Sequence, residues 1–229
     1  MASVSKLEQI VGHLDDQRLY DLGELETMGI SKMAVRRLTE RGLLTSPVRG
    51  IYIRPDFEPH ILDDHLLVAK RAPNVIFNLY SAARIHDITQ VEPNELWIGL
   101  PPSDKRPPQM GADFYLEFET LYWTRSIDVE VGVETIQLRG VPMKLTNPER
   151  TVVDMWRYSR HNPSLKDQHE RIVDEHAFQC LGAYLQANDG KTAALGSMAM
   201  QLEMSDIATE KFISFVQTYS SGFSFHRVF

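Results

Sequence analysis

The sequence predicts an α+β protein, in which an N-terminal winged helix-turn-helix domain precedes a mixed α/β domain with a helical C-terminal region. Residues 21–38 have the apolar spacing of two helices packed across a tight turn, and residues 43–53 have the composition of a two-stranded hairpin. Alternation of apolar and polar residues dominates residues 113–146, and helical spacing dominates from residue 164 onward. We expect a first domain at residues 1–54 and a second at residues 60–229, with its helical part at about 164–229.

The stretch DLGELETMGISKMAVRRL, residues 21–38, is typical of a helix-turn-helix unit. Asp21 is suited to cap the first helix, and Glu24, three residues later, completes a capping box. Gly29 provides the backbone freedom that a tight turn needs. The residues that we expect to form the buried contact between the two helices are Leu25, Ile30, Val35 and Leu38.

Residues on both sides of this unit complete a winged helix. Gly42 is suited to end the second helix, and residues 43–45 and 51–53 are then expected to form a hairpin around a loop at 46–50. An earlier helix at about residues 5–14 carries apolar residues at helical spacing, namely Leu7, Ile10, Val11 and Leu14. Three helices and a wing are enough for a small domain of roughly 55 residues.

The charge distribution indicates a localised site for a polyanion. The whole chain carries a formal charge of −7, whereas the window from Lys32 to Arg54 contains six basic residues and one acidic residue. That window carries +5, so the rest of the chain carries −12. An acidic chain with one compact basic window is typical of a protein that binds DNA at one place. For the helix-turn-helix spacing taken alone, an ordinary solvated helix face with arginines is an equal alternative.

The candidate DNA-binding residues fall into two groups by their position on the predicted winged helix. The exposed start and middle of the second helix reach base edges in a major groove, and there the sequence places Lys32, Met33, Arg36 and Arg37. The end of this helix and the wing are suited to phosphate contacts, and there the sequence places Arg41, Arg49 and Arg54. Because one patch of this charge is modest, we expect two copies to bind an inverted repeat in double-stranded DNA.

The predicted second domain begins after a linker at residues 55–59. Its first half is expected to contain a helix at 60–71 with Ile61 on its apolar side, a strand at 75–79, a short helix at 81–86 capped by Ser81, and a strand at 95–100. An exposed loop at 101–112 precedes several strands at 113–146, one of which carries Val129, Val131 and Val133. The later helices are expected at residues 147–160, at about 173–185, at 193–202 and at 205–219.

Composition and cysteine use predict a cytoplasmic protein. The single cysteine, Cys180, lies in a helical apolar pattern and is expected to be a buried thiol. One cysteine cannot form an internal disulfide, which fits a reducing compartment. The N-terminal residues MASVSKLEQIVGHL contain no long apolar run, so we expect neither a signal peptide nor a membrane partner.

The remaining polar motifs predict structural roles. His86 and Asp87 are expected to hold the short helix by hydrogen bonds, and Arg150 and Asp154, four residues apart, are expected to form an ion pair. Residues 190–192, GKT, lack the earlier glycine and the preceding strand of a phosphate-binding loop. The histidines and the cysteine lack metal-ligand spacing. The sequence therefore predicts no catalytic residue, no metal site and no cofactor.

Four motifs along the chain together resemble one known family. Residues 49–52, RGIY, are similar to an Arg-Gly-aliphatic-Tyr motif, and residues 80–88, YSAARIHDI, to a Ser-Ala-Leu-x-x-His-x-Leu helix. Residues 95–101, ELWIGLP, resemble a strand that ends in Pro, and residues 147–154, NPERTVVD, resemble a Pro-Glu-Arg-Thr-aliphatic-x-Asp helix start. In this order they resemble the AbiEi family, the antitoxins of abortive-infection toxin–antitoxin systems of type IV. The resemblance covers about residues 5–160.

The resemblance implies a function that the residues alone do not give. It implies a DNA-binding antitoxin that represses transcription of its own operon in phage defence and has no enzymatic activity. The implied partner is a nucleotidyltransferase-like toxin, which this family is described as opposing without a stable complex. The antitoxin activity is then expected beyond residue 75, and the C-terminal helices are an alternative partner surface, so direct contact with the toxin stays open.

Two other functions are consistent with a winged helix joined to a second domain. A nuclease of the restriction type would need an Asp followed by Glu-x-Lys on adjacent strands to hold a metal ion. Asp113, Glu117 and Glu119 lie on a predicted strand, but no Glu-x-Lys follows them. The other alternative is a regulator of unrelated genes that senses a ligand through its second domain.

Overall fold

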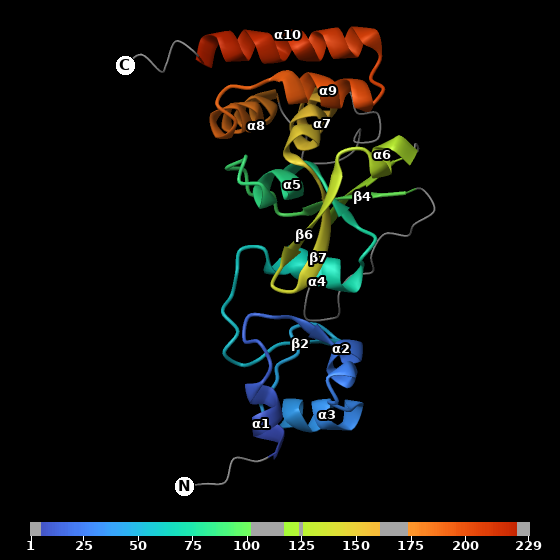
Figure 1. Ribbon diagram of the computed structural model, residues 1–229, viewed down its shortest axis with the longest axis vertical. Coiled ribbons are helices and arrows are strands. Elements are labelled where there is room, and N and C mark those ends of the chain that lie inside the picture. The colour runs from blue at the N-terminus through green and yellow to red at the C-terminus, as the bar shows by residue number, and fades with distance from the viewer. Residues whose placement is uncertain (1–5, 102–116, 124–125, 161–173, 224–229) are drawn as a thin grey trace. The chain divides into compact units, whose positions relative to one another are not determined.

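The computed structural model describes residues 6–101, 117–123, 126–160 and 174–223, and in these ranges helices and strands are interspersed up to residue 146 and only helices follow (Figure 1). The predicted α+β class is therefore confirmed. The chain divides into two units. The first runs to Asn74 and also takes in Ile136–Met143, and the second begins at Val75 and reaches the C-terminus.

Short helices pack around an apolar core in the first unit. They are α1 (Lys6–Gly12), α2 (Leu22–Thr27) and α3 (Lys32–Glu40). Gly29 adopts a φ of +83° in the turn between α2 and α3, a conformation that L side chains rarely adopt, which confirms its predicted role. The side chains predicted to join these two helices are each at most 2% exposed, namely Leu25, Ile30, Val35 and Leu38.

The strands of the first unit differ from the predicted hairpin. β1 (Tyr20–Asp21) and β2 (Ile51–Tyr52) form an antiparallel pair. The predicted pairing of residues 43–45 with 51–53 is reduced to one antiparallel bridge, between Thr45 and Ile53. Residues 51–52 instead pair with residues 20–21, which the sequence analysis did not assign to a strand. Non-local pairing of this kind is decided by the packed core and leaves little local signal.

Helix α4 (Asp63–Arg71) belongs to the first unit. It begins three residues later than predicted, because the Asp63 carboxylate accepts a hydrogen bond from the His60 N–H at 2.8 Å. Ile61 consequently precedes the helix and is 67% exposed, so its predicted place on an apolar face is wrong. The Lys70 ammonium forms ion pairs with Glu24 and with Asp21, which join α4 to the start of α2. The first unit therefore continues beyond Arg54, where the sequence places the domain end.

A mixed sheet of five strands runs in the order β5-β4-β3-β7-β6 within the described chain. β3 is antiparallel to β4 and parallel to β7, and β4 is parallel to β5. All five side-chain positions of β4 are buried, as expected for an inner strand. The strands are β3 (Ile76–Phe77), β4 (Leu96–Leu100), β5 (Phe118–Tyr122), β6 (Val133–Leu138) and β7 (Val141–Thr146).

Two predictions for this region need correction, and one lies outside the described residues. Val129 lies in helix α6 (Ser126–Glu130) and not on a strand. Ser81 lies inside helix α5 (Leu79–Ile85), where its hydroxyl accepts a hydrogen bond from the Trp97 N–H at 2.8 Å, so it is not the predicted cap. The predicted loop at 101–112 and Asp113 fall almost entirely within residues that the structure does not describe.

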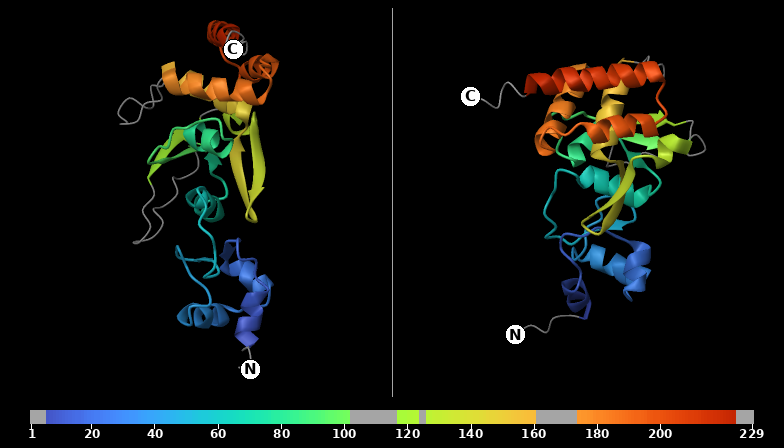
Figure 2. Two further views of the ribbon diagram at one scale, coloured as in Figure 1. Left: turned by 90° about the vertical axis from the view of Figure 1, so that its left-hand side faces the viewer. Right: turned by 45° about the horizontal axis from the view of Figure 1, so that its top comes forward.

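Helices from the later part of the chain pack around α7 (Pro148–Arg160) (Figures 1 and 2). α7 contacts α5, α8 and α9, and α10 contacts α8 and α9. Pro148 occupies the first turn of α7, where a missing N–H costs nothing. The three C-terminal helices are α8 (Asp174–Ala187), α9 (Ala193–Gln201) and α10 (Asp206–Phe223).

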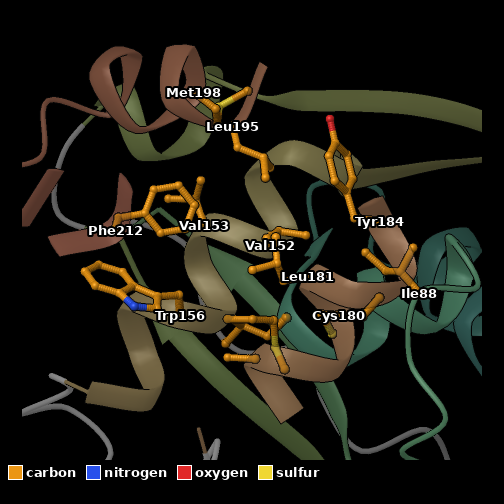
Figure 3. Close-up of a cluster of buried hydrophobic side chains, with 14 of the residues drawn as sticks. Ile88, Val152, Val153, Trp156, Cys180, Leu181, Tyr184, Leu195, Met198 and Phe212 are labelled. Atoms are coloured by element: carbon orange, nitrogen blue, oxygen red, sulfur yellow. The ribbon is translucent and has the colours of Figure 1, made fainter. Parts of the chain in front are cut away.

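The core of the second unit lies between these helices. Figure 3 shows side chains from α7, α8, α9 and α10 converging on one cluster. The rings of Trp156 and Phe212 meet edge to face, with their centroids 5.2 Å apart. Cys180 is fully buried, as predicted, and burial raises the pKa of its thiol to about 12. This cysteine is therefore a packing residue and not a nucleophile.

The side chain of Arg150 is fully buried among oxygen atoms of the second unit. Its Nε donates to Asp154 at 2.5 Å, which confirms the predicted ion pair, and its Nη1 donates to the Val131 carbonyl at 2.6 Å. Asp128 approaches Nη2 at 3.9 Å. The guanidinium also lies over the Trp123 ring, 5.2 Å from its centroid. α7 thereby holds the chain that joins α6 to β6.

We expect Arg150→Met to lower the free energy of unfolding by about 3–5 kcal/mol, because it leaves the carboxylate of Asp154 buried without its main partner. Urea unfolding followed by tryptophan fluorescence measures this effect, since Trp97, Trp123 and Trp156 all lie in the second unit.

Arg84→Met is the matched control, because the Arg84 partner Glu92 is 71% exposed and such a pair contributes at most about 1 kcal/mol. Adding Asp154→Leu to Arg150→Met is expected to recover much of the loss, since the uncompensated charge is then gone. Equal unfolding midpoints for the Arg150 and Arg84 variants would contradict a structural role for the buried pair.

Candidate nucleic-acid interface

Helix α3 is oriented by its cap and by its buried face. The Ser31 hydroxyl accepts a hydrogen bond from the Ala34 N–H at 3.3 Å, which satisfies one of the unpaired donors at the start of the helix. Val35 and Leu38 are buried in the core of the first unit. Burial of this face leaves the opposite face of α3 in solvent.

The exposed face of α3 carries every residue that the sequence assigns to base edges, namely Lys32, Met33, Arg36 and Arg37. Met33 is 67% exposed, although methionine is usually buried. Arg36 Nε donates to Glu40 at 2.8 Å, and their side chains are 81% and 57% exposed. An exposed ion pair of this kind is weak, so a ligand can separate it readily.

Arg37 and Arg41 lie four residues apart on this helix, and both are exposed. Neither guanidinium forms an ion pair with any residue that the structure describes. Like charges at this spacing repel each other on a helix, which makes the surface unfavourable until an anion binds. Gly42 follows with a φ of +69° and ends the helix as predicted.

Arg49 projects from the short loop between Thr45 and Ile51. The loop is closed by hydrogen bonds to the Val48 carbonyl from the Ser46 hydroxyl, at 2.9 Å, and from the Ile51 N–H, at 3.0 Å. Arg49 is exposed and has no side-chain partner within the described chain. The loop therefore presents a cation that no described carboxylate balances.

Arg54 has a different environment from the other predicted contacts. Its Nη1 donates to the Leu14 carbonyl at 2.9 Å, and its Nε and Nη2 donate to the two carboxylate oxygens of Asp56 at 2.8 and 2.6 Å. The side chain is 22% exposed. Arg54 thus ties the residues after β2 to the turn that follows α1, and its charge is balanced by Asp56.

Helix α4 carries two cations in its last turn that no sequence pattern assigned to a site. The Lys70 side chain is 7% exposed and is neutralised by Glu24 and Asp21. Arg71 is exposed, and its Nη1 lies 3.4 Å from where a Cβ of Gly50 would stand. Because Arg71 is far from the loop in sequence, no local pattern indicates this neighbourhood.

The start of α2 combines the predicted capping box with Lys70. Asp21 accepts from the Glu24 N–H at 2.9 Å, and Glu24 accepts from the Asp21 N–H at 3.0 Å, which confirms the capping box. Burial alone raises the pKa of both carboxyls, but these hydrogen bonds and the Lys70 ammonium outweigh it. The pKa values of Asp21 and Glu24 consequently lie below their ordinary values.

Two polar side chains of the second unit, those of His86 and Tyr184, are engaged in structural contacts. His86 Nε2 lies 2.8 Å from the Thr146 carbonyl, consistent with its predicted role in holding α5. The Tyr184 hydroxyl donates to Glu149 at 2.9 Å. Within the described ranges, no group of three or more His, Cys, Asp and Glu side chains is placed to hold a metal ion. None of the described helices is long and apolar enough to cross a membrane.

Comparisons with known proteins do not identify a family. No family model matches the chain, and a search of curated proteins gives no match. Among solved structures, the chain is similar to the crystal structure of the RV2827C protein from Mycobacterium tuberculosis, with 18% sequence identity and a TM-score of 0.44. This similarity covers 87% of this chain and 82% of that chain.

We expect the contacts between α2 and α4 to weaken as the pH falls from 7 to 3.5. Because the pKa values of Asp21 and Glu24 are lowered in the folded state, their stabilising contribution is complete above their ordinary values of 3.8 and 4.5. It is lost as the pH falls through the lowered values. Amide hydrogen exchange in residues 20–27 and 63–71, corrected for intrinsic rates, measures the opening free energy.

Glu24→Gln is expected to reduce this protection at pH 7 by about 1–2 kcal/mol, between the values for exposed and buried ion pairs, and to flatten its pH dependence. Glu26→Gln changes an exposed residue of the same helix and serves as the control. A pH profile that is the same for Glu24→Gln and the wild type would exclude the Lys70 ion pairs as its cause.

Proposed function

We propose that this chain is a winged helix-turn-helix protein that binds double-stranded DNA through α3 and the Arg49 loop. The observation that carries the proposal is the set of exposed cations without ion-pair partners in the described chain, namely Lys32, Arg37, Arg41 and Arg49. They occur in a protein whose net charge is −7. A basic helix face on an acidic protein supports a dedicated polyanion site.

The exposure of α3 supports a division of roles among these residues. Lys32, Met33, Arg36 and Arg37 occupy the solvent face of the helix and are proposed to reach base edges in the major groove. Arg36 and Arg37 have the fork geometry that matches guanine, and Arg36 would exchange Glu40 for the base.

Phosphate contacts are proposed for Arg41 at the end of α3 and for Arg49 in the loop. Arg54, to which the sequence also assigns a phosphate, is proposed instead as a structural residue, because Asp56 and the Leu14 carbonyl occupy its donors. We propose that two copies bind an inverted repeat in the promoter of the protein's own operon, since one copy carries few contacts.

The proposed biological role is that of an antitoxin and autorepressor, and it rests on the resemblance of residues 49–52, 80–88, 95–101 and 147–154 to the AbiEi family. The proposed partner of this role is a nucleotidyltransferase-like toxin encoded beside it. The first unit would read the operator, and the second unit would supply the antitoxin activity without enzymatic chemistry.

We expect Arg36→Ala and Arg37→Ala each to reduce discrimination between promoter DNA and random DNA by roughly tenfold or more. Arg49→Ala should weaken binding to both DNAs alike and flatten the salt dependence by about one unit of slope, as for a lost phosphate contact. Fluorescence anisotropy titrations at several salt concentrations measure both quantities.

Arg54→Ala removes the same charge from a paired site and is the control, with an expected salt slope equal to that of the wild type. Thermal denaturation checks that each variant is folded. If Arg36→Ala and Arg37→Ala bind promoter DNA as the wild type does, α3 is not the reading helix. If the wild type binds neither DNA at low salt, the proposed function is wrong.

The antitoxin role predicts that a fragment from Val75 to the C-terminus rescues growth when it is expressed with the neighbouring toxin. Tryptophan fluorescence shows whether the fragment is folded, because all three tryptophans lie in it. Continued growth arrest with a folded fragment would count against the assignment, and rescue by residues 1–74 alone would overturn it.

A further inference from the structure

The cations of the first unit divide into two classes by their partners. Arg18, Lys70 and Arg139 are ion-paired with carboxylates in addition to Arg36 and Arg54. The cations that the structure describes there without such a partner are Lys32, Arg37, Arg41, Arg49 and Arg71. Four of these five already belong to the proposed DNA-binding surface, and Arg71 is the remaining member.

Arg71 lies beside the loop that carries Arg49. Gly50 has a φ of +86°, and a Cβ there would lie 3.4 Å from Arg71 Nη1, at ordinary van der Waals contact. The guanidinium of Arg71 therefore rests against the peptide next to Arg49. Both side chains are exposed, and neither is balanced by a carboxylate within the described chain.

The position of Arg71 is fixed by its neighbour in α4. Lys70 is 7% exposed and holds the last turn of the helix on Glu24 and Asp21 at the start of α2. At the other end of α4, Asp63 lies 3.6 Å from Arg139 Nη1, which also donates to the Glu58 carbonyl at 2.7 Å. Because both ends are tied down within the same unit, α4 holds Arg71 in place although its guanidinium forms no ion pair with a described residue.

We infer that Arg71 is a phosphate contact of the DNA interface, so that the interface extends from α3 and the Arg49 loop onto α4. The inference rests on the proposed function. Arg71 lies against Gly50, the residue next to Arg49, so a phosphate bound at this loop would meet two cations that no described carboxylate balances. α4 thus supplies a backbone contact and contributes nothing to base reading, because phosphates carry no sequence information.

The test is the salt dependence of binding of the full chain to a mixed-sequence DNA duplex. Arg71→Ala should weaken binding several-fold near 0.1 M salt and reduce the slope of log K against log salt by about 0.9, the value for one lost phosphate contact. Arg71→Lys keeps the charge and should keep most of the slope. Arg84→Ala removes one charge from an ion pair in the second unit and should leave the slope unchanged.

The outcomes separate this inference from the proposed function. If Arg49→Ala lowers the slope and Arg71→Ala does not, the DNA interface stands and its extension onto α4 is wrong. A slope lowered equally by Arg71→Ala and Arg84→Ala would assign the effect to net charge and overturn the inference. Absence of binding by the wild-type chain would overturn both. Since Arg71 forms no ion pair with a residue that the structure describes, equal melting temperatures are expected for Arg71→Ala and the wild type.

Discussion

A cation that leaves water must be surrounded by oxygen atoms, because burial removes the solvation that stabilises its charge. Each unit of this chain contains such a cation. The side chain of Arg150 has no exposed surface and lies against Asp154 and a main-chain carbonyl, while Lys70 is 7% exposed and lies against Glu24 and Asp21. Each joins segments that are separate in the chain, so the packing of both units depends on satisfying these charges.

The same requirement makes the cations that lack a described carboxylate partner informative about function. The carboxylates near the start of α2 form ion pairs with Lys70 and Arg18, and Asp56 forms an ion pair with Arg54. What is left on the first unit is a set of exposed cations that form no ion pair with any residue that the structure describes. Net negative charge on the rest of the chain disfavours polyanions elsewhere, which is consistent with the proposed binding of DNA at this surface.

The features that the sequence predicts correctly are local in the chain. The capping box of Asp21 and Glu24, the turn at Gly29 and the pair of Arg150 with Asp154 each involve residues within one or two helical turns. Their geometry follows from spacing alone. The helix predicted at residues 147–160 matches α7 for the same reason, since apolar residues at helical spacing indicate a helix locally.

The features that the sequence does not predict depend on contacts between residues that are far apart in the chain. Arg54 donates a hydrogen bond to the Leu14 carbonyl, Arg71 lies against Gly50, and residues 51–52 pair with residues 20–21. An arginine that is balanced and one that is free look the same in a sequence, because the difference lies in its tertiary neighbours. Composition therefore locates the basic window, but only the packing of α4 and the loops decides which of its cations have a carboxylate partner and which do not.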